Sequence, residues 1–264
     1  MDDSGKRVSG GLIYEPCGDN AVFVTGYTGK PEALVIPDAL DGKPVLGIER
    51  GAFCSCASLT EVTVPDSVRF IGEAAFCGCA SLHSLRLPPT LDEIEDRAFE
   101  ACVSLREAGL PWSVKRLGAA IFRGCTSLQR AVFCCSHGLV PNDMFMGCSS
   151  LTEVYIDSTV DNIGFGAFES CASLRVVHFL KEREINTIPN GFRFIHGQAF
   201  KGCRSLTELK MPKGEALIIW DNAFDDCPAL TLVVEPNSSA RYYAITHYIS
   251  YRLPTLSEIL RVHR

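Results

Sequence analysis

Apolar and polar positions recur along most of the chain in a unit of about 23 residues, and three columns of residues mark each unit. The first column is Phe53, Phe76, Phe99, Phe122, Phe145, Phe168, Phe200 and Phe224. A Cys follows each Phe after three residues, and a Leu follows each Cys after three more, from Cys56 and Leu59 to Cys227 and Leu230. Eight copies of three columns in step indicate a protein built from structural repeats.

Each Leu opens a short segment in which apolar and polar residues alternate, as in Leu59-Thr-Glu-Val62-Thr-Val64-Pro65. This period of two predicts a strand with one buried face, ended by the Pro. A second apolar pair, such as Val68 and Ile71, is expected to line an opposite wall. The Ala-Phe segment should then turn the chain back through a short helical or 3₁₀ turn, with glycines supplying positive φ. One unit cannot bury its own apolar face, so the units must stack as a solenoid.

The two ends of the chain depart from the repeat. Residues 1–44 are expected to form an N-terminal cap, with a hairpin from 11–25 and a degenerate first coil. Eight units fill residues 45–236. Residues 237–264 are expected to form a C-terminal cap, with a helix after Asn237, an edge strand at 249–253 and a capping box from Thr255 to Glu258.

Two units are irregular. The fifth lacks its Pro and its second apolar pair around residues 133–140, and about nine extra residues lie around 180–189. Insertions in solenoids map to loops, often close to a binding surface. The insertion is therefore interpreted as a surface loop, with a functional contact as the alternative.

The pattern Ala52-Phe53-x-x-Cys56-x-Ser58-Leu59-x-x-Val62-x-Val64-Pro65-x-x-Val68-x-x-Ile71-Gly72 resembles the BspA-type leucine-rich repeat family, over about residues 45–236. The resemblance implies an α/β repeat solenoid: a right-handed superhelix with a parallel concave sheet, short helical or 3₁₀ turns, and caps at both ends. Relatives include bacterial surface proteins and adhesins that bind host proteins. The resemblance therefore implies a binding scaffold, although fold and function are separable.

The outward positions of the strands are the candidate binding site, since alternation turns the residues between buried positions toward solvent. The candidates are Arg86, Arg130, Val132, Glu153, Tyr155, Val176, His178 and Lys210. Arg and Tyr are enriched in binding hot spots, and Val132, Tyr155, Val176 and His178 form an apolar and aromatic centre. In the last unit the same count places Leu232 and Val234 outward. A solvated sheet face without a ligand is the alternative.

The chain has 13 cysteines, and eight of them share one repeat position. That spacing predicts a buried ladder of structural thiols. Stacked coils would bring neighbouring thiols within disulfide range, so free thiols favour a reducing compartment. Zinc binding by Cys54, Cys56, Cys77 and Cys79, and a redox or metal role for Cys134 and Cys135, are the alternatives; either would make the chain a metal- or thiol-dependent enzyme module.

Charge and motifs narrow the function. The net charge of -6 and the lack of a Lys/Arg cluster argue against nucleic acid as partner. No P-loop, G-x-G-x-x-G, G-x-S-x-G or metal-binding His spacing occurs, so neither catalysis nor a cofactor is expected. No apolar run is long enough for a signal peptide or a membrane span.

The expected function is therefore a non-catalytic scaffold that binds a protein, with a glycan as an alternative ligand. The chain as written is expected to be cytoplasmic, and to be at the cell surface or secreted if a leader has been removed. A structural fragment of a larger surface protein is a further alternative.

Overall fold

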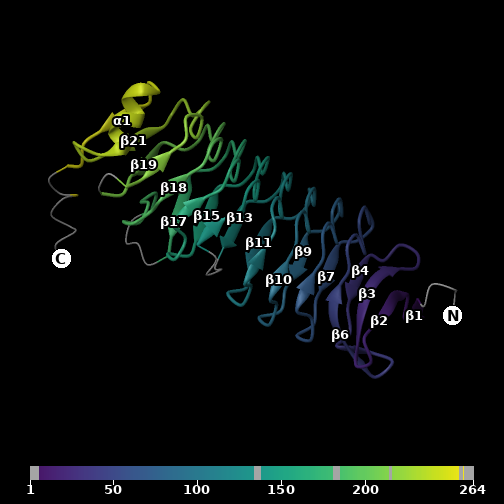
Figure 1. The fold of residues 1–264 in the computed structure, drawn as a ribbon. Helices are drawn as coiled ribbons and strands as arrows, with labels where there is room; N and C mark the ends of the chain where they lie inside the picture. Colours follow the sequence, from purple (N-terminus) through teal and green to yellow (C-terminus); the bar gives the residue numbers. More distant parts are fainter. Residues whose placement is uncertain (1–5, 134–137, 181–184, 214–215, 256–257, 259–264) are drawn as a thin grey trace.

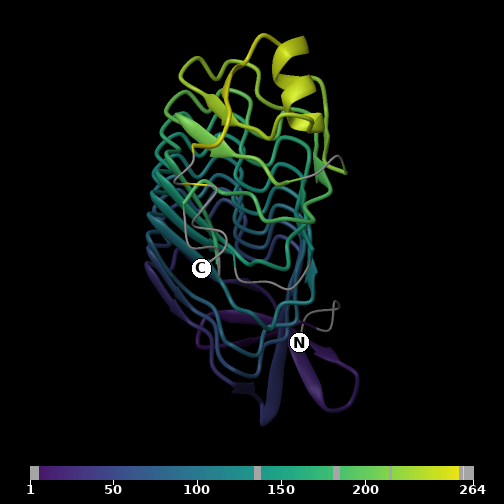
Figure 2. The ribbon, with the colours of Figure 1, turned by 90° about the vertical axis from the view of Figure 1, so that its left-hand side faces the viewer.

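The computed structural model describes residues 6–133, 138–180, 185–213, 216–255 and 258. Along these residues the chain winds into a β-solenoid whose coils stack from the N-terminal hairpin to a short helix at the other end (Figure 1). From the side, successive coils of similar outline follow one another from the N-terminal hairpin at the bottom to the C-terminal helix at the top (Figure 2). The irregular fifth unit falls partly outside this range, at Cys134–His137.

The strands that follow the Leu column, with one further strand at each end, form one wall, which we call the Leu-strand sheet. They are β4 (Ala33–Val35), β7 (Glu61–Thr63), β9 (Ser84–Arg86), β11 (Glu107–Leu110), β13 (Arg130–Phe133), β15 (Glu153–Ile156), β17 (Val176–Phe179), β19 (Glu208–Lys210), β21 (Thr231–Val233) and β22 (Ser250–Arg252). Neighbouring strands pair in parallel within the groups β4-β7-β9, β11-β13-β15-β17 and β19-β21-β22. The predicted parallel sheet is therefore confirmed, and β4 and β22 add to it at both ends. The handedness of the superhelix stays a prediction.

Shorter strands form the opposite wall. They are β6 (Lys43–Ile48), β8 (Phe70–Ile71), β10 (Glu93–Ile94), β12 (Arg116–Leu117), β14 (Leu139–Val140), β16 (Asn162–Ile163), β18 (Phe194–Ile195) and β20 (Ile218–Ile219). Ile71, Ile94 and Ile163 of the second apolar pair are fully buried against the core. The second apolar pair thus lines the second wall, as predicted.

The N-terminal segment is a hairpin joined to this second wall. Strands β2 (Leu12–Cys17) and β3 (Ala21–Tyr27) pair antiparallel, and β3 pairs in parallel with β6. Strand β1 (Arg7–Ser9) extends the hairpin, and β5 (Ala39–Leu40) pairs antiparallel with β6. The predicted hairpin is confirmed.

The C-terminal segment contains the predicted helix and edge strand. Helix α1 (Ser239–Thr246) begins after Ser238, whose hydroxyl accepts a hydrogen bond from the Arg241 N–H at 3.2 Å. Strand β22 pairs in parallel with β21. The Glu258 carboxylate accepts a hydrogen bond from the Thr255 N–H at 2.7 Å, as a capping box requires. The helix expected after it lies outside the described residues.

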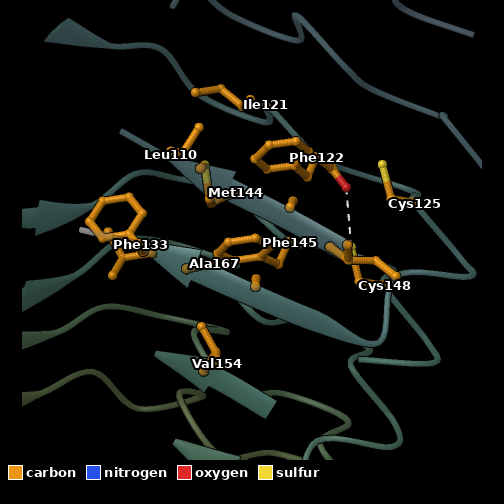
Figure 3. Packing of buried hydrophobic residues seen from close by; sticks show 14 of the residues in the cluster. Leu110, Ile121, Phe122, Cys125, Phe133, Met144, Phe145, Cys148, Val154 and Ala167 are labelled. Atoms are coloured by element: carbon orange, nitrogen blue, oxygen red, sulfur yellow. Dashed lines mark hydrogen bonds between the residues drawn. The ribbon is translucent and has the colours of Figure 1, made fainter. Parts of the chain in front are cut away.

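The Phe and Cys columns form the corner of every coil, where the Phe rings of neighbouring coils stack with centroids 5.1–5.9 Å apart. From Cys79 onward, each Cys thiol of the column donates a hydrogen bond to the carbonyl of the Phe one coil earlier, as Figure 3 shows for Cys148 and Phe122. The donors are Cys79, Cys102, Cys125, Cys148, Cys171, Cys203 and Cys227, at 3.0–3.3 Å. The predicted ladder of structural thiols is confirmed.

The short helical or 3₁₀ turn expected around each Phe is not what the described coils adopt. Two residues near each Phe from Phe53 to Phe200 have positive φ, such as Ala74 at 53° and Gly78 at 72°, which interrupts a right-handed helix; near Phe224 only Asp226 does. The N–H groups instead alternate in direction. The Cys77 N–H donates to the Ala74 carbonyl within the same coil, whereas the Phe76 N–H donates to the Ala98 carbonyl of the next coil. The corner is thus tied to its neighbour at every second residue.

A second kind of glycine closes the tight bend after the second-wall strands. A Cβ on Gly118 would lie 2.2 Å from the backbone nitrogen of Asp96, and one on Gly72 would lie 2.6 Å from that of Arg50. Positive φ was expected for the repeat glycines. Gly78 does have positive φ. Gly72 and Gly118 do not, and they must be glycine because the backbone of the neighbouring coil leaves no room for a Cβ.

Candidate functional site

Six of the eight candidate residues lie on three adjacent strands of the Leu-strand sheet. The parallel register aligns Arg130, Glu153 and Val176 in one row. The second row, two residues further along the strands, is Val132, Tyr155 and His178. We call these six residues the three-strand patch. The strands β13, β15 and β17 place their side chains one coil apart, and strand alternation sends the intervening residues into the core.

Tyr155 is the centre of the three-strand patch. The Arg130 guanidinium carbon lies 4.7 Å from the centroid of its ring, a cation–π contact. Its hydroxyl donates a hydrogen bond to the Glu153 carboxylate at 3.2 Å. The His178 ring is tilted by 41° to it, with centroids 5.4 Å apart. These contacts hold the Tyr155 ring in place before any ligand arrives, which lowers the entropy cost of binding.

Arg86 lies apart from the three-strand patch. It is exposed on β9, and β11 separates it from β13. The matching position on β11 is Gly109, where a Cβ would meet nothing within 4 Å. The surface therefore dips between Arg86 and Val132, and a ligand that contacts both must bridge this dip.

Lys210 belongs to a different cluster. Its ammonium lies 3.1 Å from the Glu258 carboxylate. Arg252 contacts both Glu258 and Glu208 at 2.9 Å. The Arg252 guanidinium, with further help from the Thr255 N–H, holds the pKa of Glu258 well below its usual range. Lys210 therefore takes part in fastening the C-terminal segment to β19 and β22.

In the last unit, the strand positions expected to point toward solvent point into the core. Leu232 and Val234 are fully buried, and Leu232 pairs with the inward Leu209. The prediction that both point outward is wrong, because one residue is missing between Leu230 and the strand. Thr231 occupies the position that Glu208 has in the preceding coil.

The insertion borders the three-strand patch and enters the Leu-strand sheet. Asn186, 8% exposed, donates its backbone N–H to the Val177 carbonyl at 2.7 Å. Its side chain accepts a hydrogen bond from the Val177 N–H at 2.7 Å and donates one to the Arg175 carbonyl at 3.0 Å.

On its other side the insertion contacts the next coil. The Asn186 carbonyl accepts a hydrogen bond from the Lys210 N–H, and Thr187 forms a bridge with Lys210. The described part of the insertion thus separates β17 from β19, while Phe168 and Phe200 remain stacked at 5.3 Å. It is therefore more than the surface loop expected from the sequence, and it ends the three-strand patch on one side. Residues 181–184 lie outside the described chain.

A second exposed cluster, absent from the sequence predictions, lies on the opposite wall. His196 and Trp220 stack at 5.7 Å, and Phe194 lies 5.8 Å from His196. Trp220 is 54% exposed and Ile218 is 51% exposed. We call Phe194, His196, Ile218 and Trp220 the Trp220 cluster. The sequence could have indicated this cluster, because Phe194 and His196 flank the buried Ile195 and therefore point away from the core.

The cysteine alternatives concern metal binding at Cys54, Cys56, Cys77 and Cys79 and at Cys134 and Cys135. No group of three or more His, Cys, Asp or Glu side chains that could hold a metal occurs among the described residues. Cys134 and Cys135 fall outside that part of the chain. Over the same residues, no helix has the length and hydropathy needed to cross a bilayer.

The profile of the BspA type leucine rich repeat region matches residues 47–175 and 179–256, in six copies. No curated protein sequence matches the chain. A leucine-rich repeat protein from T. pallidum has a solved structure that is 32% identical, with a TM-score of 0.61, over 76% of this chain and 90% of that one. A leucine-rich repeat protein from Eubacterium ventriosum is 20% identical, with a TM-score of 0.57, over 80% of this chain and 62% of that one, and shows the fold alone.

The family profile covers most of the chain, and the T. pallidum protein shares its repeat over most of its own length. The Phe and Cys columns of the matched repeats form the stacked corner of the solenoid. The chain therefore belongs to the BspA-type leucine-rich repeat family.

Proposed function

We propose that the protein is a non-catalytic scaffold that binds a protein ligand through the three-strand patch. The observation that carries the proposal is the arrangement around Tyr155, in which Arg130, Glu153 and His178 all contact one ring or its hydroxyl. Leucine-rich repeat proteins commonly serve as protein-binding scaffolds. The proposal assigns this general role to the three-strand patch.

The chemistry of the patch favours a protein over the glycan alternative. Val132 and Val176 offer apolar area beside the ring, and Arg130 and Glu153 offer one charge of each sign. A central aromatic residue with an Arg beside it is the composition of a protein-binding hot spot, and the polar rim can pair with side chains of the partner. We expect the ligand to present an apolar side chain to Tyr155 and an acidic one to Arg130.

The experiment begins with a partner isolated on the immobilised protein and measures its affinity for variants. Tyr155→Ala and Arg130→Ala should each weaken binding by about tenfold or more, in line with about 2 kcal/mol for a hot-spot residue. Thr63→Ala, exposed on the same face on the distant strand β7, is the matched control and should bind as the unmodified protein does.

Two results would contradict the proposal. One is unchanged affinity of Tyr155→Ala in a variant with intact circular dichroism. The other is loss of binding on Trp220→Ala alone, which would place the contact on the opposite wall, at the Trp220 cluster.

We further propose a reducing working environment for the protein. The ladder thiols are all free and placed in neighbouring coils, where oxidation would compete with their hydrogen bonds. A count of free thiols on protein isolated from its native cells under alkylating conditions tests this. Disulfides among Cys79, Cys102 and Cys125 would contradict it and favour the alternative of a secreted or surface location.

A further inference from the structure

Two cysteines outside the buried ladder occupy the same position in adjacent coils near the N-terminal end. Cys54 follows Phe53, and Cys77 follows Phe76, and these two Phe rings stack at 5.1 Å. The backbone is held in register on both sides of the pair. The Phe53 N–H donates to the Ala75 carbonyl at 2.8 Å, and the Ser55 N–H donates to the Cys77 carbonyl at 2.7 Å.

This register sets the separation of the two cysteines. Stacked coils are about 4.8 Å apart, and disulfides form between Cα atoms about 4.4–6.8 Å apart. The two thiols are also near enough to interact, since Cys54 contributes to the raised pKa of the Cys77 thiol. A bond between them therefore needs a change of side-chain rotamer and little movement of the backbone.

The two thiols differ from those of the ladder in exposure. Cys54 is exposed and Cys77 is half-buried, whereas Cys79 and Cys102 are buried and donate to Phe carbonyls. Burial, with contributions from Cys54 and Glu100, raises the pKa of the Cys77 thiol. Cys54 is thus the thiol that a reagent in solution meets first, and Cys77 is placed to react second.

A hollow beside Cys54 gives a small molecule access. It has a volume of about 600 Å³ and is lined in part by Tyr27, Lys30, Cys54 and Ser58. Lys30 is exposed and carries a positive charge that suits a carboxylate. A low-molecular-weight disulfide with carboxylate groups fits this charge.

We propose that Cys54 and Cys77 form a reversible cross-coil disulfide by exchange with such a low-molecular-weight disulfide. The Cys54 thiolate attacks one sulfur of the small disulfide, whose S–S bond breaks and releases one small thiol. The Cys77 thiolate then attacks Cys54 Sγ and releases the second small thiol. The protein loses two electrons and two protons in all, and the small disulfide is reduced to two thiols.

The bond would join the first two repeat coils next to the N-terminal hairpin. Segments near the end of a chain open locally at a lower free energy than the centre of the fold. A cross-link between residues 54 and 77 restricts the opened state more than the closed one. Oxidation should therefore stabilise this end of the solenoid and leave the three-strand patch unchanged.

The test incubates the full chain with glutathione disulfide and reads intact mass and peptide maps. The expected product has lost two hydrogen atoms, links the peptides that contain Cys54 and Cys77, and reverts with dithiothreitol. Cys77→Ser should instead retain one glutathione on Cys54. Cys54→Ser should give no cross-link, and Cys17→Ser, a half-exposed cysteine in the hairpin, should form the bridge as the unmodified chain does.

Hydrogen exchange provides the second readout. Amides of residues 51–77 should exchange at least about tenfold more slowly in the oxidised chain, because the cross-link restricts the local opening that exchange requires. A stable glutathione adduct on Cys54 with Cys77 unreacted would overturn the proposal. So would a bridge within one coil, Cys54 to Cys56 or Cys77 to Cys79, in place of the cross-coil bond.

Discussion

The thiol of Cys148 donates a hydrogen bond to the backbone carbonyl of Phe122 in the preceding coil, at 3.1 Å (Figure 3). Burial raises the pKa of this thiol to about 12, so it stays protonated and able to donate at neutral pH. The Phe122 carbonyl also accepts a hydrogen bond from the Cys125 N–H at 3.2 Å, and the thiol supplies a second donor to the same oxygen while its small apolar side chain fills the corner. This explains why one repeat position is so rich in cysteine.

Replacing Cys148 by Ala should lower the free energy of unfolding by about 0.5–1.5 kcal/mol for the lost thiol hydrogen bond, because the Phe122 carbonyl keeps its bond from the Cys125 N–H. Cys148→Ser keeps a donor at the same position and should lose less. Urea unfolding followed by circular dichroism measures both. Cys17→Ala in the hairpin is the control, and equal stability of Cys148→Ala and the unmodified chain would mean that the thiol bond contributes nothing.

Replacing Gly118 by Ala should destabilise the protein by about 1–3 kcal/mol, because the added Cβ would press on the backbone of the preceding coil. That Cβ would lie 2.2 Å from the Asp96 nitrogen. Gly109→Ala is the matched control, since a Cβ there meets nothing within 4 Å. Thermal unfolding should show a fall in Tm for the first variant and little change for the second. Equal Tm values would refute the tight approach.

Replacing Asn186 by Ala should open the junction between the insertion and β17. The change removes the acceptor of the Val177 N–H and the donor to the Arg175 carbonyl, at about 1–3 kcal/mol for the buried groups left unpaired. Hydrogen exchange should show faster exchange at Val177. Asn186→Asp keeps the acceptor for Val177 and should protect that amide more than Ala does; the reverse order would contradict this role.

Acid should release the C-terminal segment first. Arg252 lowers the pKa of Glu258 in the folded protein, so its ion pairs stabilise the fold above the carboxylate's unfolded pKa of about 4.3. This stabilisation should decline as the pH falls below about 5 and vanish once Glu258 is protonated in both states. Hydrogen exchange at β22 between neutral and acid pH measures the release.

Glu258→Gln separates this effect from general acid unfolding. The variant should already be weakened at neutral pH and should show a smaller further change on acidification at β22. Glu61→Gln on β7, an exposed carboxylate, should behave as the unmodified chain does. A Glu258→Gln variant with unchanged acid response would contradict the assignment.

The repeat could be predicted well because each coil meets only its two neighbours. The Phe column therefore appears as a stack, and Cys79 and Cys102 as members of a buried ladder. The corner turn could not be predicted, because positive φ occurs at Ala74 as well as at Gly78. The outward count was wrong for Leu232, because a missing residue between a marker and its strand reverses every side chain after it.

The sequence by itself determined the solenoid, the alternation of its Leu-strand sheet and the burial of its thiols, since periodic burial along a chain leaves few ways to stack identical units. Only the tertiary structure decided that Tyr155 lies under Arg130, that Asn186 enters the sheet beside Val177, and that Trp220 stacks on His196. These contacts depend on side-chain rotamers and on where an inserted segment rejoins the stack. Neither is encoded in a column of residue types, because the same spacing is compatible with several side-chain directions.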